Sequence, residues 1–395
     1  MRAWDFLKWP PLVDLRQNNA MVSTPRPKVA HMTSVHAATD PRIVFKECAT
    51  LASAGYDVVL IAPEPPAEVP AGVRHRTVPF PRNRFERFTK TNREVLRAAL
   101  EERADVYHFH DPELIWIGAV LRMRGAHVIF DVHEDIPLDI RTKPWIPPAL
   151  RPGVSAVAGF VLRIMQRFFT AIVPATTSIA QTFTHRRTVV VRNYPRLEEL
   201  APADGDVPIE RRPMTALYLG SVTAIRGVEQ MVDAMAHPMM PQGARLLLAG
   251  PFEDDALRRR LETLNGWAHV DAPGRLAQRE VPRVLARSRM GLLVLQPAAS
   301  FERALPTKLF EYMACGLPVI VADFLECVQI VERFECGIVV DPRDSNQIAL
   351  AMCRLFNNPQ EARAMGERGR VAALDRYAWS NEARTLVGLY REIAS

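Results

Sequence analysis

The chain has 395 residues, of which 48% are apolar and 24% charged, so it is long enough for two or three globular domains. It has no apolar run of about 18 residues and no signal-peptide pattern at its start, and we expect a cytoplasmic protein without a membrane-spanning helix. Five cysteines without a C-x-x-C pair favour packing roles in a reducing compartment. The formal net charge of +6 is too mild to indicate a nucleic-acid binder by itself.

The first domain is expected over residues 28–195. Residues 1–27 hold four prolines and no periodic pattern, which predicts a poorly ordered N-terminal extension. From residue 28 onward, β-rich runs alternate with helical stretches such as 43–54 and 92–103, and this alternation predicts a parallel sheet with helices on both faces. The strands are expected at 28–32, 58–61, 106–109, 128–130, 171–173 and 189–191.

A second domain of the same kind is expected over residues 214–372. Residues 196–213 are polar and rich in proline, as in an interdomain linker, and the alternation restarts after them. In doubly wound sheets, ligands bind outside the carboxyl ends of the strands, so the residues that follow each strand are the candidates for a site. The strands of this domain are expected at 216–219, 245–248, 291–295, 319–321 and 337–340.

Polar side chains follow the expected strands of the first domain. His36, Asp40 and Arg42 come after the first strand. Asp40 can cap a helix that starts at Pro41, and capping does not exclude a role in the cleft. His133 follows the strand 128–130, where an imidazole can donate to a sugar hydroxyl or to a leaving phosphate oxygen, or be a structural histidine.

A metal hypothesis arises at the end of the strand 106–109. His108 and His110 share one face of that strand, and Asp111 follows them. Imidazoles beside a carboxylate can bind a transition metal, but no clear second cluster supplies further ligands. The same residues fit a strand end that turns into a capped helix, and we predict no metal site.

The most distinctive stretch of the chain is 305–320. Pro306 suits the start of a helix, Gly316 suits its left-handed stop, and an apolar strand follows. A phosphate at this helix start would meet free backbone N–H groups with Lys308 beside them, and Glu311 falls on the same helix face. The pair fits the diphosphate and ribose of a nucleotide, or it is a solvated ion pair on a surface helix.

Two other loops of the second domain are candidates for nucleotide contacts. The strand 216–219 ends in Gly220 and Ser221, and Arg226 precedes the next helix, where it can bind phosphate or be solvated. The small residues of the loop 272–276 would let a flat base approach closely. The chain contains neither G-x-G-x-x-G nor G-x-x-x-x-G-K-[ST], which argues against ordinary dinucleotide and P-loop sites.

Basic and aromatic residues gather in the first domain. Between residues 140 and 197 there are nine arginines and lysines and no Asp or Glu, and a second basic, aromatic stretch spans 80–90. This mixture suits an anionic membrane surface, where each cation contributes about 1 kcal/mol. Nucleic acid is the rival partner, and a buried helix over 154–170 with arginines at its rim is the structural alternative. We predict the membrane as partner and no nucleic acid.

These residues resemble those of the family 4 glycosyltransferases, retaining enzymes of the α/β class with the GT-B fold. In this fold two Rossmann-like domains face each other across a cleft, and a C-terminal helix, here 373–395, crosses back to the first domain. The resemblance covers nearly all of residues 28–395. Its strongest part is 305–320, which looks like the family's donor-site helix. Residues 40–43 with 51–58 are similar to the opening of a bacterial polysaccharide-type branch.

The resemblance implies a nucleotide-sugar donor of the UDP or GDP type, and no cofactor or metal. It would place the ribose at Glu311, the diphosphate at Lys308 and Arg226, and the transferred sugar or its leaving oxygen at His133. Further donor contacts are implied for Gly220, Ser221, Gly274, Leu276 and Thr307. Acceptor contacts are implied for His36, Asp40, Arg42, His110 and Asp111.

Two positions depart from the family pattern. The family usually has a second glutamate eight positions before Glu311, where this chain has Arg303. Ser221 stands where many members place a phosphate-binding arginine. These departures leave the donor sugar undefined.

We therefore predict a cytoplasmic glycosyltransferase of the hexosyltransferase type, peripheral on the inner face of the plasma membrane. It would move a sugar from the donor to a glycan or lipid-linked acceptor in cell-surface polysaccharide or glycolipid synthesis. The alternatives are a sugar-nucleotide epimerase of the same fold, a metal-dependent hydrolase using His108, His110 and Asp111, and a protein that binds a nucleotide without turnover.

Overall fold

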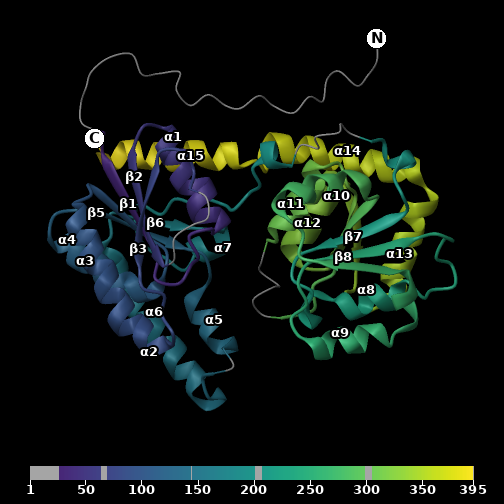
Figure 1. The fold of residues 1–395 in the computed structure, drawn as a ribbon, viewed down its shortest axis with the longest axis horizontal. Coiled ribbons are helices and arrows are strands. Elements are labelled where there is room, and N and C mark those ends of the chain that lie inside the picture. The colour runs from purple at the N-terminus through teal and green to yellow at the C-terminus, as the bar shows by residue number, and fades with distance from the viewer. Residues whose placement is uncertain (1–25, 64–68, 144, 201–206, 299–304, 395) are drawn as a thin grey trace, which may run out of the picture. The chain divides into compact units, whose positions relative to one another are not determined.

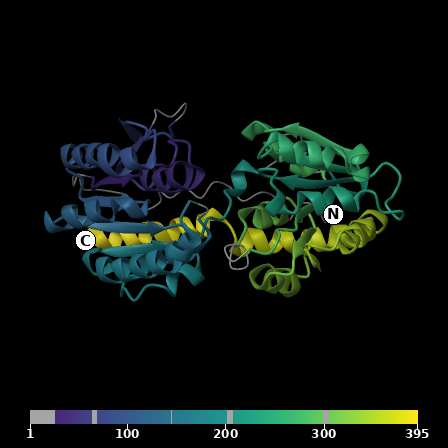
Figure 2. The same ribbon diagram turned by 90° about the horizontal axis from the view of Figure 1, so that it is seen from below.

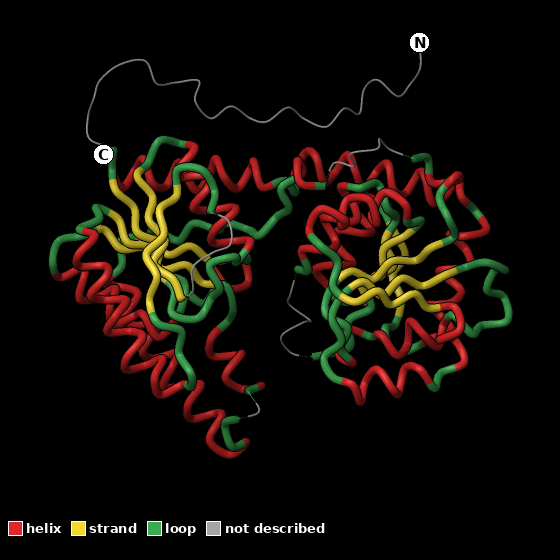
Figure 3. The backbone as a smooth tube through the Cα atoms, in the orientation of Figure 1, coloured by secondary structure: helices red, strands yellow, loops and turns green. Residues whose placement is uncertain are grey.

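The computed structural model describes residues 26–63, 69–143, 145–200, 207–298 and 305–394. These residues divide into two compact units: 26–193 with 379–394, here called the N-terminal unit, and 194–378, the C-terminal unit. Each unit contains a six-stranded parallel sheet with helices packed on it (Figures 1 and 3). The prediction of two Rossmann-like domains is therefore confirmed. None of the helices formed by the described residues is long and apolar enough to span a bilayer.

The sheet of the N-terminal unit has the order β3-β2-β1-β4-β5-β6. Its topological switch lies between β1 and β4, where doubly wound sheets bind ligands at the carboxyl ends of the strands. The strands are β1 (Lys28–Met32), β2 (Asp57–Pro63), β3 (Val73–Val78), β4 (Val106–Phe109), β5 (His127–Val132) and β6 (Ala171–Pro174). The helices are η1 (Pro41–Cys48) and η2 (Arg87–Thr91), both π-helical, with α1 (Ala49–Ser53), α2 (Arg84–Glu86), α3 (Asn92–Glu102), α4 (Ile115–Met123), α5 (Ile136–Thr142), α6 (Arg151–Met165), α7 (Thr177–Ala180) and α15 (Trp379–Ala394); 3-10 turns are η3 (Pro112–Leu114), η4 (Pro148–Leu150) and η5 (Gln166–Phe168).

The last helix of the chain completes the core of the N-terminal unit. Trp379 and Tyr390 of α15 are buried in the same hydrophobic cluster as Ile43 and Leu51. The indole N–H of Trp379 donates to Thr50 Oγ1 at 2.9 Å. Figure 2 shows this helix, in yellow, among the purple to teal elements of the N-terminal unit. Residues far apart in the chain thus share one core.

The sheet of the C-terminal unit repeats the same order as β12-β11-β10-β7-β8-β9. Its topological switch lies between β7 and β10. The strands are β7 (Thr215–Leu219), β8 (Arg245–Ala249), β9 (Val270–Gly274), β10 (Met290–Leu293), β11 (Val319–Ala322) and β12 (Gly337–Val340). The helices are α8 (Val228–Ala234), α9 (Asp255–Glu262), α10 (Val281–Arg287), α11 (Thr307–Ala314), α12 (Leu325–Phe334), α13 (Ser345–Asn357) and α14 (Pro359–Arg376); 3-10 turns are η6 (Leu197–Glu199), η7 (Ile209–Arg211), η8 (Ala224–Arg226), η9 (Asn265–His269) and η10 (Gln278–Glu280).

One expected strand is wrong and two strands were missed. The segment 189–191 runs along β6 through hydrogen bonds from Val189 N to Ile172 O and from Val191 N to Pro174 O. It makes one isolated bridge, between Ile172 and Thr188, and therefore no strand ladder. The missed strands, β3 and β9, each lie at an edge of their sheet. Both contain exposed polar residues, so neither forms the continuous apolar run from which the other strands were predicted.

Helix α11 is held against the ends of β7 and β10 by one side chain. The hydroxyl of Tyr312 accepts a hydrogen bond from Leu219 N at 2.9 Å, and its ring covers Gly291. Pro306 is the N-cap rather than the first helical residue, and Gly316 ends the helix with a φ of +67°. The expected helix and its stop are thus present.

Replacing Gly291 with alanine should destabilise the C-terminal unit by about 1–3 kcal/mol, because the added Cβ would lie 2.3 Å from a ring carbon of Tyr312. The matched control is Gly388→Ala in α15, where the added Cβ meets no atom within 4 Å. That variant should be neutral or stabilised by up to about 1 kcal/mol. Urea unfolding of both variants measures the difference, and equal midpoints would contradict the close packing of Tyr312.

Candidate active site

Five charged or imidazole side chains are buried together beneath the carboxyl ends of β1, β4 and β5. We call His31, Glu47, His108, His110 and Asp131 the buried cluster. Each of these side chains is 0% exposed. Because a buried polar group is destabilising unless it is paired, their protons and charges must be ordered.

Arg42 of η1 supplies the positive charge of this interior. Its NH2 group lies 3.0 and 3.1 Å from the two carboxylate oxygens of Asp131, and its Nε lies 2.9 Å from Glu47 Oε1. Burial opposes the ionisation of Asp131, but Arg42 and His133 outweigh it and hold the pKa of Asp131 well below its usual range. Burial and the neighbouring Asp131 raise the pKa of Glu47 well above its usual range. Asp131 is therefore ionised and Glu47 keeps a proton.

The buried histidines form a chain of close nitrogen contacts. His110 Nδ1 lies 3.3 Å from His133 Nε2, and His110 Nε2 lies 3.0 Å from His31 Nδ1. His108 Nδ1 lies 2.8 Å from the hydroxyl of Tyr390. Burial lowers the pKa of all three buried histidines, and His108 lowers the pKa values of the other two further. They are therefore neutral at pH 7.

Besides Arg42, four expected acceptor or catalytic residues of the N-terminal unit lie outside the buried cluster: His36, Asp40, Asp111 and His133. His36 Nδ1 lies 3.3 Å from Asp40 Oδ2, and His36 Nε2 lies 3.4 Å from Asp111 Oδ1. Burial acts against protonation of His36, but Asp40 and Asp111 outweigh it and raise its pKa. Asp40 also caps η1, so both roles considered for it are compatible. His133, with its side chain 20% exposed, lies beside His36 at a ring distance of 5.3 Å.

Arg42, His110 and Asp111 are buried, whereas His36 and Asp40 are partly exposed. The residue Arg42 is 4% exposed, and its NH1 donates to the carbonyl of Val191 at 2.8 Å. The side chain of His110 is 0% exposed. Arg42 and His110 can therefore influence a substrate through Asp131 and His133 rather than by direct contact.

The structure separates the residues of the metal hypothesis. Asp111 accepts hydrogen bonds from Thr33 Oγ1 at 2.7 Å and from Ser34 N at 2.6 Å, away from His108 and His110. Among the described residues, one group does offer metal-ligand atoms within 4.8 Å of one another: Glu47, His108, His110 and Asp131. The guanidinium of Arg42 lies against the carboxyl groups of both Glu47 and Asp131 and supplies a positive charge beside them. Asp131 is thus ion-paired, whereas in the described part of the chain neither carboxyl oxygen of Glu47 has a hydrogen-bond partner. The hydrolase alternative is not favoured.

In the C-terminal unit, Lys308 and Glu311 stand together at the start of α11. Their ammonium and carboxylate groups are 2.7 Å apart, with side chains 33% and 16% exposed. Thr307 is the first residue of the helix, whose first backbone N–H groups have no partner within the helix. The ion pair considered as the alternative to a nucleotide site is therefore present, and both groups remain accessible to a ligand.

The loop after β7 contains three of the expected donor residues. Gly220 has a φ of +146°, a conformation that favours glycine, and a Cβ added to Gly250 would lie 1.8 Å from the Gly220 carbonyl oxygen. Ser221 is exposed and Arg226 half-buried on the same loop. Because Leu219 N bonds to Tyr312, this loop starts where α11 is anchored.

The expected base-binding residues lie at the edge of the sheet. Gly274 ends β9 with a φ of +82°, and no heavy atom lies within 4 Å of the position its Cβ would take. Leu276 packs against the core. Arg303, which replaces the usual family glutamate, lies outside the described residues.

Sequence reasoning missed four members of the N-terminal network: His31, Glu47, Asp131 and Tyr390. Asp131 follows the apolar run 128–130 directly and stands two residues before His133, so its position at the strand end was a usable signal. Tyr390 lies 282 residues from its partner His108, and nothing in the local sequence indicates that contact.

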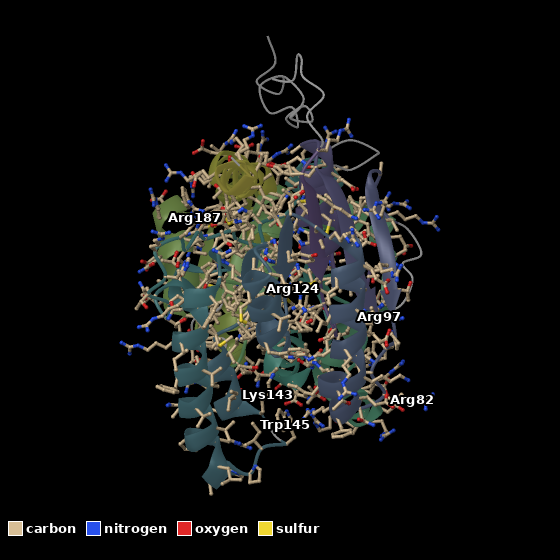
Figure 4. All side chains as sticks on the ribbon, turned by 90° about the vertical axis from the view of Figure 1, so that its left-hand side faces the viewer. Arg82, Arg97, Arg124, Lys143, Trp145 and Arg187 are labelled. Atoms are coloured by element: carbon tan, nitrogen blue, oxygen red, sulfur yellow. The ribbon has the colours of Figure 1, made fainter. Side chains whose placement is uncertain are left out.

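The basic, aromatic segments lie on the surface of the N-terminal unit. Only Ser155 and Leu162 are buried in α6, so the alternative of a buried helix is wrong. The guanidinium of Arg84 lies 3.7 Å from the ring centroid of Trp145. We call the exposed apolar residues of this region the apolar face: Phe85, Phe88, Trp145, Leu150, Val154, Val157, Phe160, Val161 and Ile164. Figure 4 labels Trp145 and basic residues on this side of the unit: Arg82, Arg97, Arg124, Lys143 and Arg187.

Two family models match the chain in succession. The model described as "Glycosyl transferase 4-like domain" matches residues 42–193, and "Glycosyl transferases group 1" matches residues 204–372. Together with the two Rossmann-like domains, these matches define the GT-B class. The chain belongs to the family 4 glycosyltransferases.

Individual relatives agree with this assignment. The phosphatidyl-myo-inositol mannosyltransferase of Mycobacterium leprae is 24% identical over 362 residues, 86% of this chain and 89% of its own. The alpha-D-kanosaminyltransferase of Streptomyces kanamyceticus is 28% identical over 190 residues, 47% of each chain. The chain spans about half the length of most of the curated relatives that it matches. The sucrose-phosphate synthase of Thermosynechococcus elongatus shares the fold, with a TM-score of 0.74 at 20% identity over 94% of this chain and 100% of its own.

The buried histidines should make the N-terminal unit sensitive to acid. Below the ordinary histidine pKa of about 6.5, the three histidines bind up to three more protons in the unfolded chain than in the folded cluster. The raised pKa of Glu47 has the opposite effect, because the folded state holds at most one proton there that the unfolded chain has released. The contribution to stability is therefore complete above pH 6.5 and lost as the pH falls below it, by about 2–3 kcal/mol per pH unit.

Unfolding by urea between pH 7 and pH 5 measures this slope. His31→Gln should make the slope shallower by about one proton, whereas His269→Gln, at an exposed position of η9, should leave it unchanged. A slope that stays the same in His31→Gln would show that this histidine is not held neutral.

Proposed function

We propose that this chain is a retaining glycosyltransferase whose C-terminal unit binds a nucleotide sugar of the UDP or GDP type. The observation that carries the proposal is the accessible pair Lys308 and Glu311, held on α11 against the switch strands β7 and β10. A cation suits the diphosphate, and a carboxylate can accept two hydrogen bonds from the vicinal ribose hydroxyls. The base would lie at Gly274 and Leu276.

The chemistry follows from where charge develops during transfer. As the bond from the sugar to the diphosphate breaks, Lys308 and Arg226 stabilise the departing anion, with Thr307, Gly220 and Ser221 beside them. A phosphate oxygen of the donor helps to deprotonate the acceptor hydroxyl, which gives retention and requires neither metal nor cofactor. His133 contacts the transferred sugar.

The acceptor is contacted by the N-terminal unit through His36 and Asp40, with the buried Asp111 behind His36. We propose a glycan or lipid-linked acceptor of cell-surface polysaccharide or glycolipid synthesis, reached from the cytoplasmic side of the membrane. The apolar face and the exposed basic residues of the same segments, such as Arg82 and Arg84, fit a surface of anionic lipid. The name of the Mycobacterium leprae relative, a phosphatidyl-myo-inositol mannosyltransferase, supports an acceptor held in a membrane. An epimerase would instead convert the donor without any acceptor.

A nucleoside diphosphate should stabilise the protein against heat, and a panel of UDP, GDP and ADP identifies the base. At one hundred times its Kd, the preferred nucleotide contributes about 2.7 kcal/mol, and the melting shift should persist in EDTA. Glu311→Ala should remove most of the shift, while Glu332→Ala, exposed on α12, should keep it. If no nucleotide raises the melting temperature, or if Glu311→Ala changes nothing, the donor site is wrongly placed.

Binding to anionic vesicles tests the membrane surface. Changing Arg82, Arg84 and Lys90 together to glutamine should weaken cosedimentation about 100-fold at low salt, since each cation contributes about 1 kcal/mol. Arg87 is left intact because it is ion-paired with Glu113.

Two further variants complete the vesicle experiment. The charge-matched control changes Arg259, Arg283 and Arg287 to glutamine, which are exposed on α9 and α10 and form no ion pair with another described residue, and it should bind normally. Val157→Ser with Phe160→Ser should weaken the binding that remains at high salt. Sedimentation that no variant alters would remove the membrane from the proposal.

A further inference from the structure

The Nε2 atom of His133 lies close to two polar atoms of neighbouring residues. Its Nε2 lies 3.3 Å from Asp131 Oδ1 and 3.3 Å from His110 Nδ1. Asp131 is ionised, so its oxygens can only accept hydrogen bonds. A lone pair on His133 Nε2 would be repelled by that oxygen, whereas an N–H that donates to His110 would be attracted to it. His110 Nδ1 lies 3.7 Å from Asp131 Oδ2, so the shorter distance to His133 Nε2 favours the proton on His133.

The same proton orders the rest of the imidazole chain. With His133 Nε2–H as donor, His110 Nδ1 must accept, because two N–H groups cannot face each other at 3.3 Å. Neutral His110 then carries its proton on Nε2 and donates to His31 Nδ1 at 3.0 Å. Each imidazole has one donor and one acceptor, so the tautomer of the first determines the next two.

His108 fits the same arrangement from the other side of Asp131. Its Nε2 lies 3.5 Å from Asp131 Oδ2, while its Nδ1 lies 2.8 Å from the Tyr390 hydroxyl. A proton on Nε2 is attracted to the carboxylate at this distance, although it makes no hydrogen bond there, and it leaves Nδ1 to accept from the tyrosine. In this arrangement Asp131 does not have to donate a hydrogen bond to any group of the cluster. Arg42 keeps the carboxylate charged and fixed in place.

We propose that Asp131 is a positioning residue that holds His133 in the Nε2–H tautomer. The unprotonated Nδ1 atom, with its lone pair, then faces the substrate as a hydrogen-bond acceptor. Among the described residues, no hydrogen bond to His133 Nδ1 is found, and the side chain is 20% exposed. The inference rests on the proposed function only in that His133 meets the sugar.

The tautomer determines which substrate group His133 can bind. In its neutral form, His133 accepts a hydrogen bond at Nδ1 and has no second N–H to give. It therefore recognises a hydroxyl of a sugar, and does not donate to a leaving phosphate oxygen. Of the two partners considered for this residue, the hydroxyl is the one that the geometry selects.

Nitrogen-15 NMR of histidine-labelled protein at pH 8 tests the proposal directly. The signals of His133 are assigned as those lost in His133→Gln. The expected pattern is a protonated Nε2 and an unprotonated Nδ1, which are distinguished by their shifts and by their couplings to the ring protons. A protonated Nδ1, or an average of the two tautomers, would overturn the proposal even if the variants folded poorly, since the unmodified protein decides it.

Asp131→Asn should convert the His133 signals to a mixture of tautomers and lower kcat about 100-fold, with the affinity for the nucleoside diphosphate unchanged. The matched control is Asp57→Asn, which removes the carboxylate of an exposed pair with Arg74 and should alter neither measurement. Unchanged His133 signals in Asp131→Asn would show that this carboxylate does not set the tautomer. If His133→Gln keeps full turnover, His133 has no part in the proposed reaction, whatever its tautomer.

Discussion

The ion pair between Arg42 and Asp131 is the interaction on which the polar interior of the N-terminal unit depends. Burying two charges is unfavourable unless their remaining hydrogen-bonding groups are satisfied, and removing one partner of such a pair typically costs about 3–5 kcal/mol. Here the guanidinium also bonds to the Val191 carbonyl and lies against Glu47. Three segments of the chain therefore converge on one charge, and the imidazoles around it take the protonation states that it allows.

The candidate site residues of the two units are held in position by different kinds of contact. The C-terminal unit relies on backbone geometry: glycine loops in contact with each other, a helix start, and one tyrosine that ties α11 to β7. The N-terminal unit relies on a network of side chains in which each proton depends on its neighbour. A rigid diphosphate site suits the first arrangement, whereas a polyhydroxylated sugar, which both donates and accepts, suits the second.

The sequence predicted what local patterns determine. Apolar runs located most of the strands, and proline and glycine marked both ends of α11. The edge strands β3 and β9 were not predicted, because they are partly polar. The segment 189–191 was predicted as a strand, but an apolar run can also lie beside a sheet without forming a ladder of hydrogen bonds.

For the candidate site, the local sequence predicted the positions of some residues but not their partners, which come from distant parts of the chain. Asp40, Asp111 and His133 follow their strands as expected, but their partners depend on tertiary contacts. That Arg42 and His110 face inward, and that Asp131 organises them, depends on burial, which spacing along one strand cannot reveal.

The docking of α15 has a consequence for exchanging parts between related enzymes. The N-terminal unit is not a continuous piece of sequence, because Tyr390 and Trp379 reach its core from the end of the chain. A chimera that transplants only residues 26–193 would leave His108 beside a foreign final helix and break the tyrosine contact. A functional graft of the N-terminal unit therefore has to carry the last helix with it, as two separate crossovers rather than one.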